Sequence, residues 1–154
     1  ASVLVLDLDH FKLVNDRFGH LVGDQVLAAV AASVRDEVRD EDLVGRFGGE
    51  EFVVLLQGPE GEDPRSGARA VAERIRERIA ALRVAVAGPH ETVVVEGLTV
   101  SIGGATAPRD GNDLAALLEI ADAAMYEAKR AGRNLVRMGL PVNIPKQLRR
   151  ADRA

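Results

Sequence analysis

The sequence of 154 residues contains no cysteine and no tryptophan, and aromatic residues make up only 3% of it. Without cysteine there is no disulfide framework and no thiolate zinc site, which fits a reducing compartment such as the cytoplasm. The shortage of aromatic rings argues against binding of single-stranded nucleic acid by base stacking. The net charge of −4 provides no overall attraction for a polynucleotide either, so we expect no nucleic-acid partner.

Long hydrophobic runs are also missing. No apolar stretch approaches the roughly 20 residues that cross a bilayer, and the apolar segment 1–6 is too short for a signal peptide. We therefore expect no membrane contact by this domain. What is present is 47% hydrophobic and 29% charged residues, which is typical of one globular domain with a core of valine, leucine, alanine and isoleucine.

The hydrophobic pattern predicts an α+β domain in which helices pack on a central, mostly antiparallel sheet. Continuous apolar residues over 2–6 indicate a central strand that is buried on both faces. The expected elements, in chain order, are a strand over 2–6, helices over 11–16 and 23–38, a hairpin over 43–56, a loop over 58–67, a helix over 68–82, strands over 92–95 and 98–102 with a turn at 96–97 between them, a helix from Leu114 capped by Asp113, and a strand over 134–138.

The middle of the chain carries a Gly48-Gly49 pair between two β-prone runs. This pattern predicts a tight hairpin, because glycine accepts the positive φ that a primed turn requires. Glu50 and Glu51 follow at once. Adjacent strand residues point to opposite faces, so the two carboxylates would have different roles if the strand has begun there. By itself the stretch fits either a solvated acidic tip or a metal and phosphate site.

A second pair of carboxylates, Asp7 and Asp9, ends the first strand. If the hairpin pairs beside that strand, Asp7 and Glu50 meet at one edge of the sheet. Mg²⁺ prefers oxygen ligands and takes few of them from protein, the rest coming from water and substrate phosphates. Two such ions can activate an attacking hydroxyl and neutralise a leaving pyrophosphate. The alternative is that Asp7 and Asp9 merely end a strand.

Five short blocks extend this pattern along the chain. They are 7–16 (DLDHFKLVND), 19–24 (GHLVGD), 46–52 (RFGGEEF), 101–103 (SIG) and 121–134 (ADAAMYEAKRAGRN). Each block alone is a weak signal, but in this order and spacing the chain resembles the GGDEF family of bacterial diguanylate cyclases, from residue 2 to about 136. The family tolerates glutamate at the third position of its motif, as at Glu50.

The resemblance implies a palm-like nucleotidyl cyclase fold and the condensation of two GTP to cyclic di-GMP and two pyrophosphates. It implies two Mg²⁺ or Mn²⁺ ions per GTP, held by the carboxylates of Asp7 and Glu50 and by the carbonyl of Leu8. Glu50 would also accept the proton. Glu51 would either assist the metals or only shape the turn. Lys12 would stabilise phosphate charge as a compact cation, the alternative being a solvated helix lysine.

The same resemblance implies the nucleotide contacts. Asn15 and Asp24 would read guanine, whose edge offers both donors and acceptors, although both residues also suit helix capping. His20 resembles the family's substrate-contacting histidine. Alternatively, it is a loop residue without a functional role. Lys129 and Arg133 match the family's triphosphate contacts. Alternatively, they are ordinary cations near a helix C-terminus, where positive charge is favourable.

A regulatory site is implied by Arg39-x-x-Asp42, which is separated from the Gly48-Gly49 pair by five residues. In the family an Arg-x-x-Asp at this place binds the product and inhibits the enzyme, and arginine suits a phosphodiester and a guanine face. Arg74 resembles a secondary arginine of that site. The alternative is an ordinary charged surface, because 35–42 is rich in charge in any case.

The domain boundaries follow from the resemblance. Residues 1–138 are expected to form the GGDEF domain without the helical segment that usually precedes its first strand, and 139–154 a tail or linker. Catalysis would need a homodimer, and an upstream sensor domain is expected in the full-length bacterial, cytoplasmic protein. Two alternatives stay open: a non-catalytic module that binds GTP or cyclic di-GMP, and another palm-type nucleotidyl cyclase or polymerase relative.

Overall fold

The computed structural model describes residues 1–58 and 63–139. Its elements, in chain order, are β1 (Ser2–Leu8), α1 (Phe11–Phe18), α2 (His20–Asp36), β2 (Leu43–Arg46), β3 (Glu51–Leu56), α3 (Pro64–Ala80), β4 (Val84–Ala87), β5 (Thr92–Val95), β6 (Val100–Thr106), α4 (Leu114–Arg130) and β7 (Val136–Met138). The predicted tail 139–154 lies, apart from its first residue, outside the described residues. Within the described part, none of the helices combines the length and apolar character needed to cross a bilayer.

The main sheet has five strands in the order β2-β3-β1-β6-β7. All neighbouring pairs are antiparallel except β6 and β7, which run parallel. The prediction of a mostly antiparallel sheet flanked by helices is therefore confirmed. The expectation of a central first strand is confirmed as well, since every residue of β1 is buried between β3 and β6.

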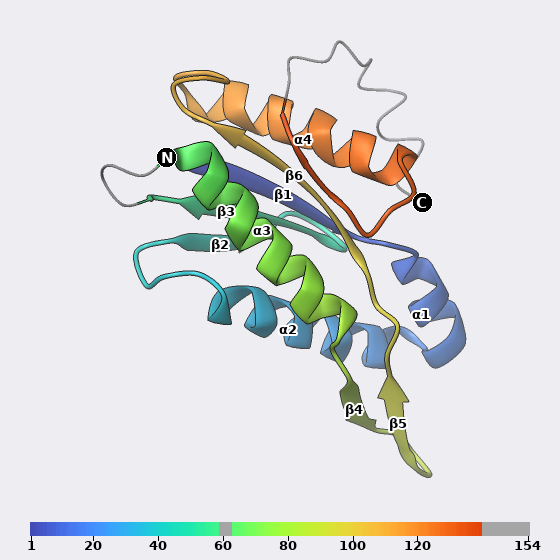
Figure 1. Ribbon diagram of the computed structural model, residues 1–154. Coiled ribbons are helices and arrows are strands. Elements are labelled where there is room, and N and C mark those ends of the chain that lie inside the picture. The colour runs from blue at the N-terminus through green and yellow to red at the C-terminus, as the bar shows by residue number, and fades with distance from the viewer. Residues whose placement is uncertain (59–62, 140–154) are drawn as a thin grey trace.

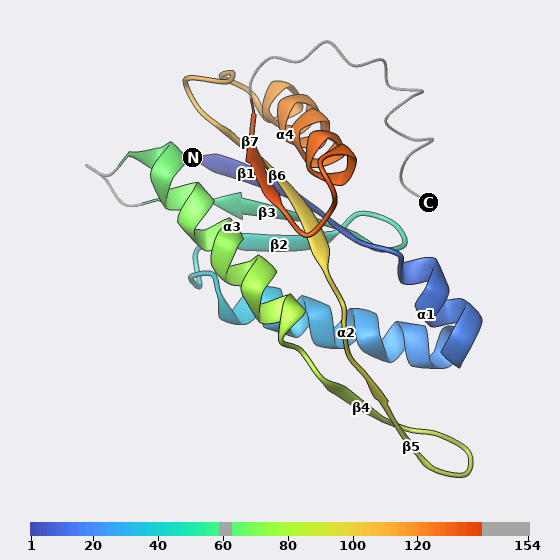
Figure 2. The same ribbon diagram turned by 45° about the vertical axis from the view of Figure 1, so that its right-hand side comes forward.

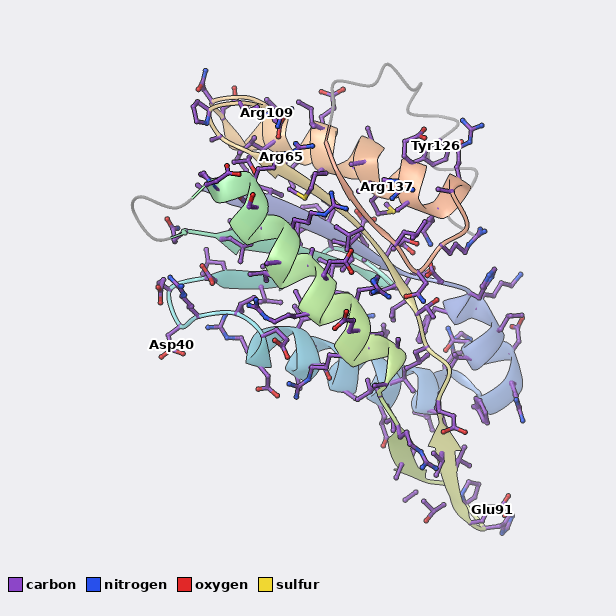
Figure 3. All side chains as sticks on the ribbon, in the orientation of Figure 1. Asp40, Arg65, Glu91, Arg109, Tyr126 and Arg137 are labelled. Carbon is purple, nitrogen blue, oxygen red and sulfur yellow. The ribbon has the colours of Figure 1, made fainter. Side chains whose placement is uncertain are left out.

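Helices cover both faces of this sheet. Figures 1 and 2 show α4 on one face, α2 and α3 on the other, and α1 beyond the end of β1, with the β4–β5 ribbon projecting away from the body. Glu91, labelled in Figure 3, marks the tip of that ribbon. The two faces have separate cores, one shared with α1, α2 and α3 and a smaller one under α4.

The alternation of side chains along β1 decides which face receives the first carboxylate. Leu4 and Leu6 belong to the core with α2 and α3, whereas Val3 and Val5 belong to the core under α4. Because successive strand residues point to opposite faces, Asp7 falls on the face of Val3 and Val5. The chain thus directs Asp7 toward α4.

Gly103 allows α4 to lie close to β6. A Cβ atom at this position would meet the backbone of α4 at Ala121 O and Met125 N. No other residue type fits without moving the helix, because a helical backbone cannot rotate away as a flexible side chain can. The close approach fixes the height of α4 above the sheet and so sets where its last turn lies.

Two helices begin earlier than the sequence analysis predicted. Helix α2 starts at His20 instead of residue 23, and α3 starts at Pro64, inside the expected loop 58–67. The cause at α3 is local. The Asp63 carboxylate accepts hydrogen bonds from the N–H groups of Arg65 and Ser66, and proline suits the first helical position.

The strands expected over 92–95 and 98–102 belong to two different sheets. Gly97 has a φ of 76°, which agrees with a turn at this point. The strands on either side do not pair with one another, however: β5 pairs with β4, a strand that was not predicted, and β6 pairs with β1 and β7. The last strand also begins at Val136, two residues after its predicted start.

Candidate active site

The hairpin tip is a short turn that leaves Glu50 outside the strand. Gly48 and Gly49 have φ angles of 67° and 39°, so the predicted positive values are confirmed. The Phe47 N–H donates to the Glu51 carbonyl at 2.7 Å, which closes the turn, and β3 begins at Glu51. Glu50 is therefore a turn residue, and Glu51 is the first residue of the strand.

The tip rests against the end of β1. The Leu8 N–H donates to the backbone carbonyl of Glu50 at 3.3 Å, and Asp7 is the register partner of Glu51. Directly opposed residues of an antiparallel pair present their side chains to the same face. Asp7 and Glu51 therefore share the α4 face, with Glu50 beside them, and the two carboxylate pairs of the sequence meet at one end of the sheet.

A buried lysine from α4 completes this cluster. The Lys129 Nζ lies 3.0 Å from Asp7 Oδ1 and 3.4 Å from Asp9 Oδ1, and all three side chains are at most 3% exposed. Three carboxylates (Asp7, Asp9, Glu50) and one ammonium give the cluster a formal charge of −2. Buried charges persist only when paired or bound to a counter-ion. The excess of negative charge makes this end of the sheet a place for cations.

The electrostatics of Glu50 reflect this excess. Burial raises the pKa of its carboxyl above the ordinary 4.5, and the neighbouring Asp7 carboxylate raises it further, whereas the Lys129 ammonium lowers it. Two carboxylates that share a site disfavour each other's ionised forms. A carboxylate with a raised pKa is also a better proton acceptor, and such perturbed groups are frequent at functional sites.

The predicted guanine-reading residues lie together on α1 and α2. Gly23 has no side chain, and a Cβ atom there would overlap the Asn15 amide, so this glycine lets α1 pack against α2 with Asn15 between them. Asp24 follows Gly23 directly and is exposed, as are His20 at the start of α2 and Lys12 on the first turn of α1. The structure thus groups Asn15 with Asp24, beyond the end of β1 that carries Asp7.

Arg133 lies in a turn after α4. It has a φ of 66°, and Asn134 follows with 49°, a left-handed conformation that is uncommon for residues other than glycine. The Arg133 N–H donates to the Ala128 carbonyl at 3.0 Å. The Nε of Arg133 is buried and has no hydrogen-bond partner in residues 1–58 and 63–139. A buried donor of this kind suits an anionic ligand.

The donor set at this end of the sheet fits Mg²⁺ or Mn²⁺. The carboxylates of Asp7 and Glu50 and the carbonyl of Leu8 are hard oxygen ligands, and Mg²⁺ usually takes only one or two carboxylates from protein. In the part of the chain that the structure describes, no three histidine, aspartate or glutamate side chains form a closed metal cluster. Such a site would take its remaining ligands from water and from substrate oxygens.

The predicted product-binding residues lie at the other end of the sheet. Arg39, Asp42 and Arg74 line a cavity of about 450 Å³ between the end of α2, the end of β3 and the start of α3. Ser2, at the start of β1, also lines this cavity. Because Ser2 and Asp7 are five residues apart on one strand and each residue spans about 3.3 Å, the cavity lies about 16 Å from Asp7. Asp40, labelled in Figure 3, marks the α2–β2 loop on this side of the domain, away from α1.

The Arg39–Asp42 turn is held in place by its own polar groups. The Asp42 carboxylate accepts from the N–H groups of Arg39 and Gln57, each at 2.9 Å. The Arg35 guanidinium donates to the carbonyl of Asp42 at 2.7 Å and to that of Arg39 at 2.9 Å. Arg74 forms an ion pair with Glu37 at 3.3 Å on the wall of the same cavity.

Two residues of these sites were not predicted from the sequence. Asp9 was considered only as a strand end, yet it lies at the centre of the Lys129 cluster. Its position two residues after Asp7 was the available signal, because i and i+2 share a face of an extended chain. Arg35 carried no signal, since its role depends on the course of the loop that follows α2.

The chain belongs to the GGDEF domain family. It matches the family described as diguanylate cyclase, GGDEF domain, over residues 1–135. It is 41% identical over 134 residues to the probable diguanylate cyclase DgcT of Escherichia coli, covering 87% of this chain and 28% of that protein. It is 42% identical over 136 residues to the response regulator PleD of Caulobacter vibrioides, covering 88% and 28%. The chain thus spans less than a third of the length of these two curated relatives.

Solved structures agree with this assignment. The active GGEEF domain of a diguanylate cyclase from Vibrio cholerae superposes with a TM-score of 0.76 at 32% identity, covering 92% of this chain and 83% of that one. The GGDEF domain of DgcB from Caulobacter crescentus, in complex with c-di-GMP, gives a TM-score of 0.75 at 33% identity, covering 89% and 76%. The predicted palm-like fold of the family is therefore confirmed.

Proposed function

We propose that this chain is the catalytic domain of a diguanylate cyclase, which condenses two GTP into cyclic di-GMP and two pyrophosphates. The observation that carries the proposal is the meeting of Asp7, Leu8 and Glu50 where β1 ends against the hairpin tip. Family membership supports the same activity.

The chemistry follows from these groups. Asp7, Glu50 and the Leu8 carbonyl would hold two Mg²⁺ or Mn²⁺ ions per GTP. When bound, the ions lower the pKa of the attacking 3′-hydroxyl and neutralise the leaving pyrophosphate. Glu50 would take the proton as each 3′-oxygen bonds to the α-phosphorus of the other GTP and the bond to pyrophosphate breaks. Its raised pKa supports this role, and Glu51 would fix the end of the strand or assist at the same face.

Cations around the cluster suit the triphosphate. The Lys129 ammonium lies 3.0 Å from Asp7 Oδ1 and 3.4 Å from Asp9 Oδ1 and would also donate to a phosphate oxygen. Arg133, with its buried Nε, would bind a second oxygen. Lys12 is exposed on α1 and would neutralise phosphate charge from the solvent side. These contacts position the α-phosphorus, which is the main contribution of protein to such a reaction.

Base recognition would rest on the pair of residues at α1 and α2. The Asp24 carboxylate accepts from the guanine N1–H and N2–H₂ edge, and the Asn15 amide donates to its acceptors. His20, exposed at the start of α2, would contact the substrate from the same side. Gly23 supports the arrangement because it leaves room for the Asn15 amide.

The reaction requires two copies of the site. One chain would bind one GTP, and the two nucleotides must face each other, so catalysis would occur in a homodimer. An upstream sensor domain that controls this encounter is expected in the longer protein. Relatives support such coupling: PleD is named a response regulator, and a solved structure shows the diguanylate cyclase SiaD in complex with its activator SiaC.

Product inhibition belongs to the proposal as well. Cyclic di-GMP would bind Arg39, Asp42 and Arg74 in the cavity at the far end of the sheet. The hydrogen bond from the Arg39 N–H to the Asp42 carboxylate, which holds this turn in place, supports the proposed binding. Arg39→Ala should raise the cyclic di-GMP concentration that halves the rate by about tenfold or more, since a charge-assisted contact is lost. The initial rate should stay near that of wild type.

The control for this measurement is Arg83→Ala, because Arg83 is 70% exposed and pairs with Glu96 outside the cavity. Its inhibition curve should overlay that of wild type. Equal inhibition of the Arg39 variant and wild type would remove Arg39 from the product site.

The activity itself is tested by incubation of the protein with GTP and Mg²⁺, followed by chromatography of the nucleotides. We expect cyclic di-GMP from wild type, none from Asp7→Asn or Glu50→Gln, and normal yield from Glu96→Gln, a carboxylate that is 62% exposed. Bound GTP without a cyclic product would favour the binding module. Preference for ATP over GTP would favour another palm-type nucleotidyl cyclase.

A further inference from the structure

The carboxylate of Asp9 accepts from four donors. Its Oδ2 accepts from Thr99 Oγ1 at 2.7 Å and from the Asn134 N–H at 3.0 Å. Its Oδ1 accepts from Ser101 Oγ at 2.7 Å and from Lys129 Nζ at 3.4 Å. The side chain is fully buried. Four donors, from Thr99 just before β6, from β6, from α4 and from the turn after α4, therefore fix this carboxylate in one orientation.

The ammonium of Lys129 is shared between two carboxylates. It lies 3.0 Å from Asp7 and 3.4 Å from Asp9, and the lysine side chain is 2% exposed. If Asp7 were its sole partner, the ammonium would neutralise Asp7, and a cation could bind there only by leaving a buried lysine unpaired, which is costly. With Asp9 as a second partner, the Lys129 ammonium remains paired with a carboxylate when Asp7 binds a cation.

We infer that Asp9 is a positioning residue that holds Lys129 as a shared partner and so leaves Asp7 able to bind a divalent cation. This inference rests on the proposed function, because it concerns the same cation site. Asp9 itself does not touch the substrate in this account. It acts through Lys129, and its contact with the Asn134 N–H also steadies the left-handed turn that carries Arg133.

The informative substitution is Asp9→Asn. The side-chain oxygen of asparagine can still accept from Thr99 and from the Asn134 N–H, and hydroxyl groups can reverse their role toward the new amide. The shape and most hydrogen bonds are therefore kept, while the negative charge facing Lys129 is lost. Lys129 then pairs with Asp7 alone, and the affinity of Asp7 for a divalent cation should fall.

The test is a Mn²⁺ titration of the chain without nucleotide, in which electron paramagnetic resonance reports the free ion. Asp9→Asn should raise the dissociation constant of Mn²⁺ by about fivefold or more, the coupling expected for neighbours in one ionic network. Lys129→Met, which removes the competing ammonium, should bind Mn²⁺ at least as tightly as wild type. The double variant should match Lys129→Met within about twofold, because Asp9 then has no lysine to hold.

A matched control separates this effect from the loss of a buried carboxylate. Asp110 is also buried, accepts from the Thr106 N–H at 2.8 Å, and lies at the other end of β6. Asp110→Asn should lower the unfolding temperature but leave the Mn²⁺ dissociation constant unchanged. Should Asp9→Asn fail to fold, the comparison of Lys129→Met with the double variant still decides, since the double variant buries no unpaired ammonium.

Three results would overturn the inference. The first is a folded Asp9→Asn variant that binds Mn²⁺ as wild type does. The second is a double variant that binds more weakly than Lys129→Met, since Asp9 would then act on the cation directly. The third is Mn²⁺ binding by wild type that Asp7→Asn does not weaken, and this result would also remove the cation site of the proposed function. The first two leave that site, and cyclase activity, intact.

Discussion

The packing of α4 on β6 depends on the missing side chain of Gly103, and replacing it with alanine tests that dependence. A Cβ atom there would meet Ala121 O, Met125 N and Ala124 C, the last at 2.9 Å. All three are helix backbone atoms, so the helix must rise from the sheet as a unit. Overpacking of a buried site costs about 1–3 kcal/mol. Gly103→Ala should lie at the upper end of that range because no flexible side chain can yield.

For a chain of this size, each kcal/mol lowers the unfolding temperature by about 2–4 °C. Gly103→Ala should therefore unfold some 6–12 °C below wild type by this scaling in circular dichroism melts, with a matching shift in urea. Lys129 lies one helical turn beyond Met125, so cyclase activity should fall with the displaced helix. Gly67→Ala is the control: apart from its chain neighbours and the backbone of its own helix, no described atom lies within 4 Å of the added methyl group, and stability should rise by about 0.5–1 kcal/mol. A loss below about 0.5 kcal/mol for Gly103→Ala would refute the packing argument.

Two further substitutions test the site. Because the folded-state pKa of Glu50 is raised above 4.5, its ionisation opposes folding, so the stability it contributes is present below that pH and is lost as the pH rises through the raised value. Without divalent cations, Glu50→Gln should have a higher melting temperature than wild type at pH 7 but not at pH 4. Added Mg²⁺ should stabilise wild type alone. A melting temperature of Glu50→Gln below that of wild type at pH 7 would contradict the direction of the pKa shift. Gly23→Ala should displace the Asn15 amide and reduce the preference for GTP over ATP by about tenfold, measured as the ratio of kcat/KM values; an unchanged ratio would show that Asn15 takes no part in base recognition.

The sequence allowed prediction wherever the physical cause was local. The Gly48-Gly49 turn could be predicted because positive φ angles favour glycine, and β1 could be placed at the centre because its apolar run is uninterrupted. The start of α3 was missed although Asp63 and Pro64 form a recognisable beginning of a helix. The glycine and proline residues of 58–67 favour a loop, and this preference conflicts with the capping signal of Asp63.

Features that depend on distant residues could not be predicted in the same way. The pairing of β5 with β4 is one example, because the pattern of 92–95 does not specify a partner. The Lys129 cluster is another: the ammonium joins residues more than a hundred positions apart, and its place depends on how closely α4 approaches Gly103. The resemblance to the family indicated a functional role for Lys129. Its contacts with Asp7 and Asp9 could not be predicted without the register of β1, β3 and β6.

The central claim is that Asp7 and Glu50 hold divalent cations beneath the triphosphate of GTP. The most direct test is a crystal structure of the protein with Mn²⁺ and a non-hydrolysable GTP analogue, recorded with anomalous scattering. Anomalous density is expected at about 2.1 Å from a carboxylate oxygen of each residue and from phosphate oxygens. Nucleotide bound with its phosphates away from Asp7, and no anomalous density between Asp7 and Glu50, would contradict it.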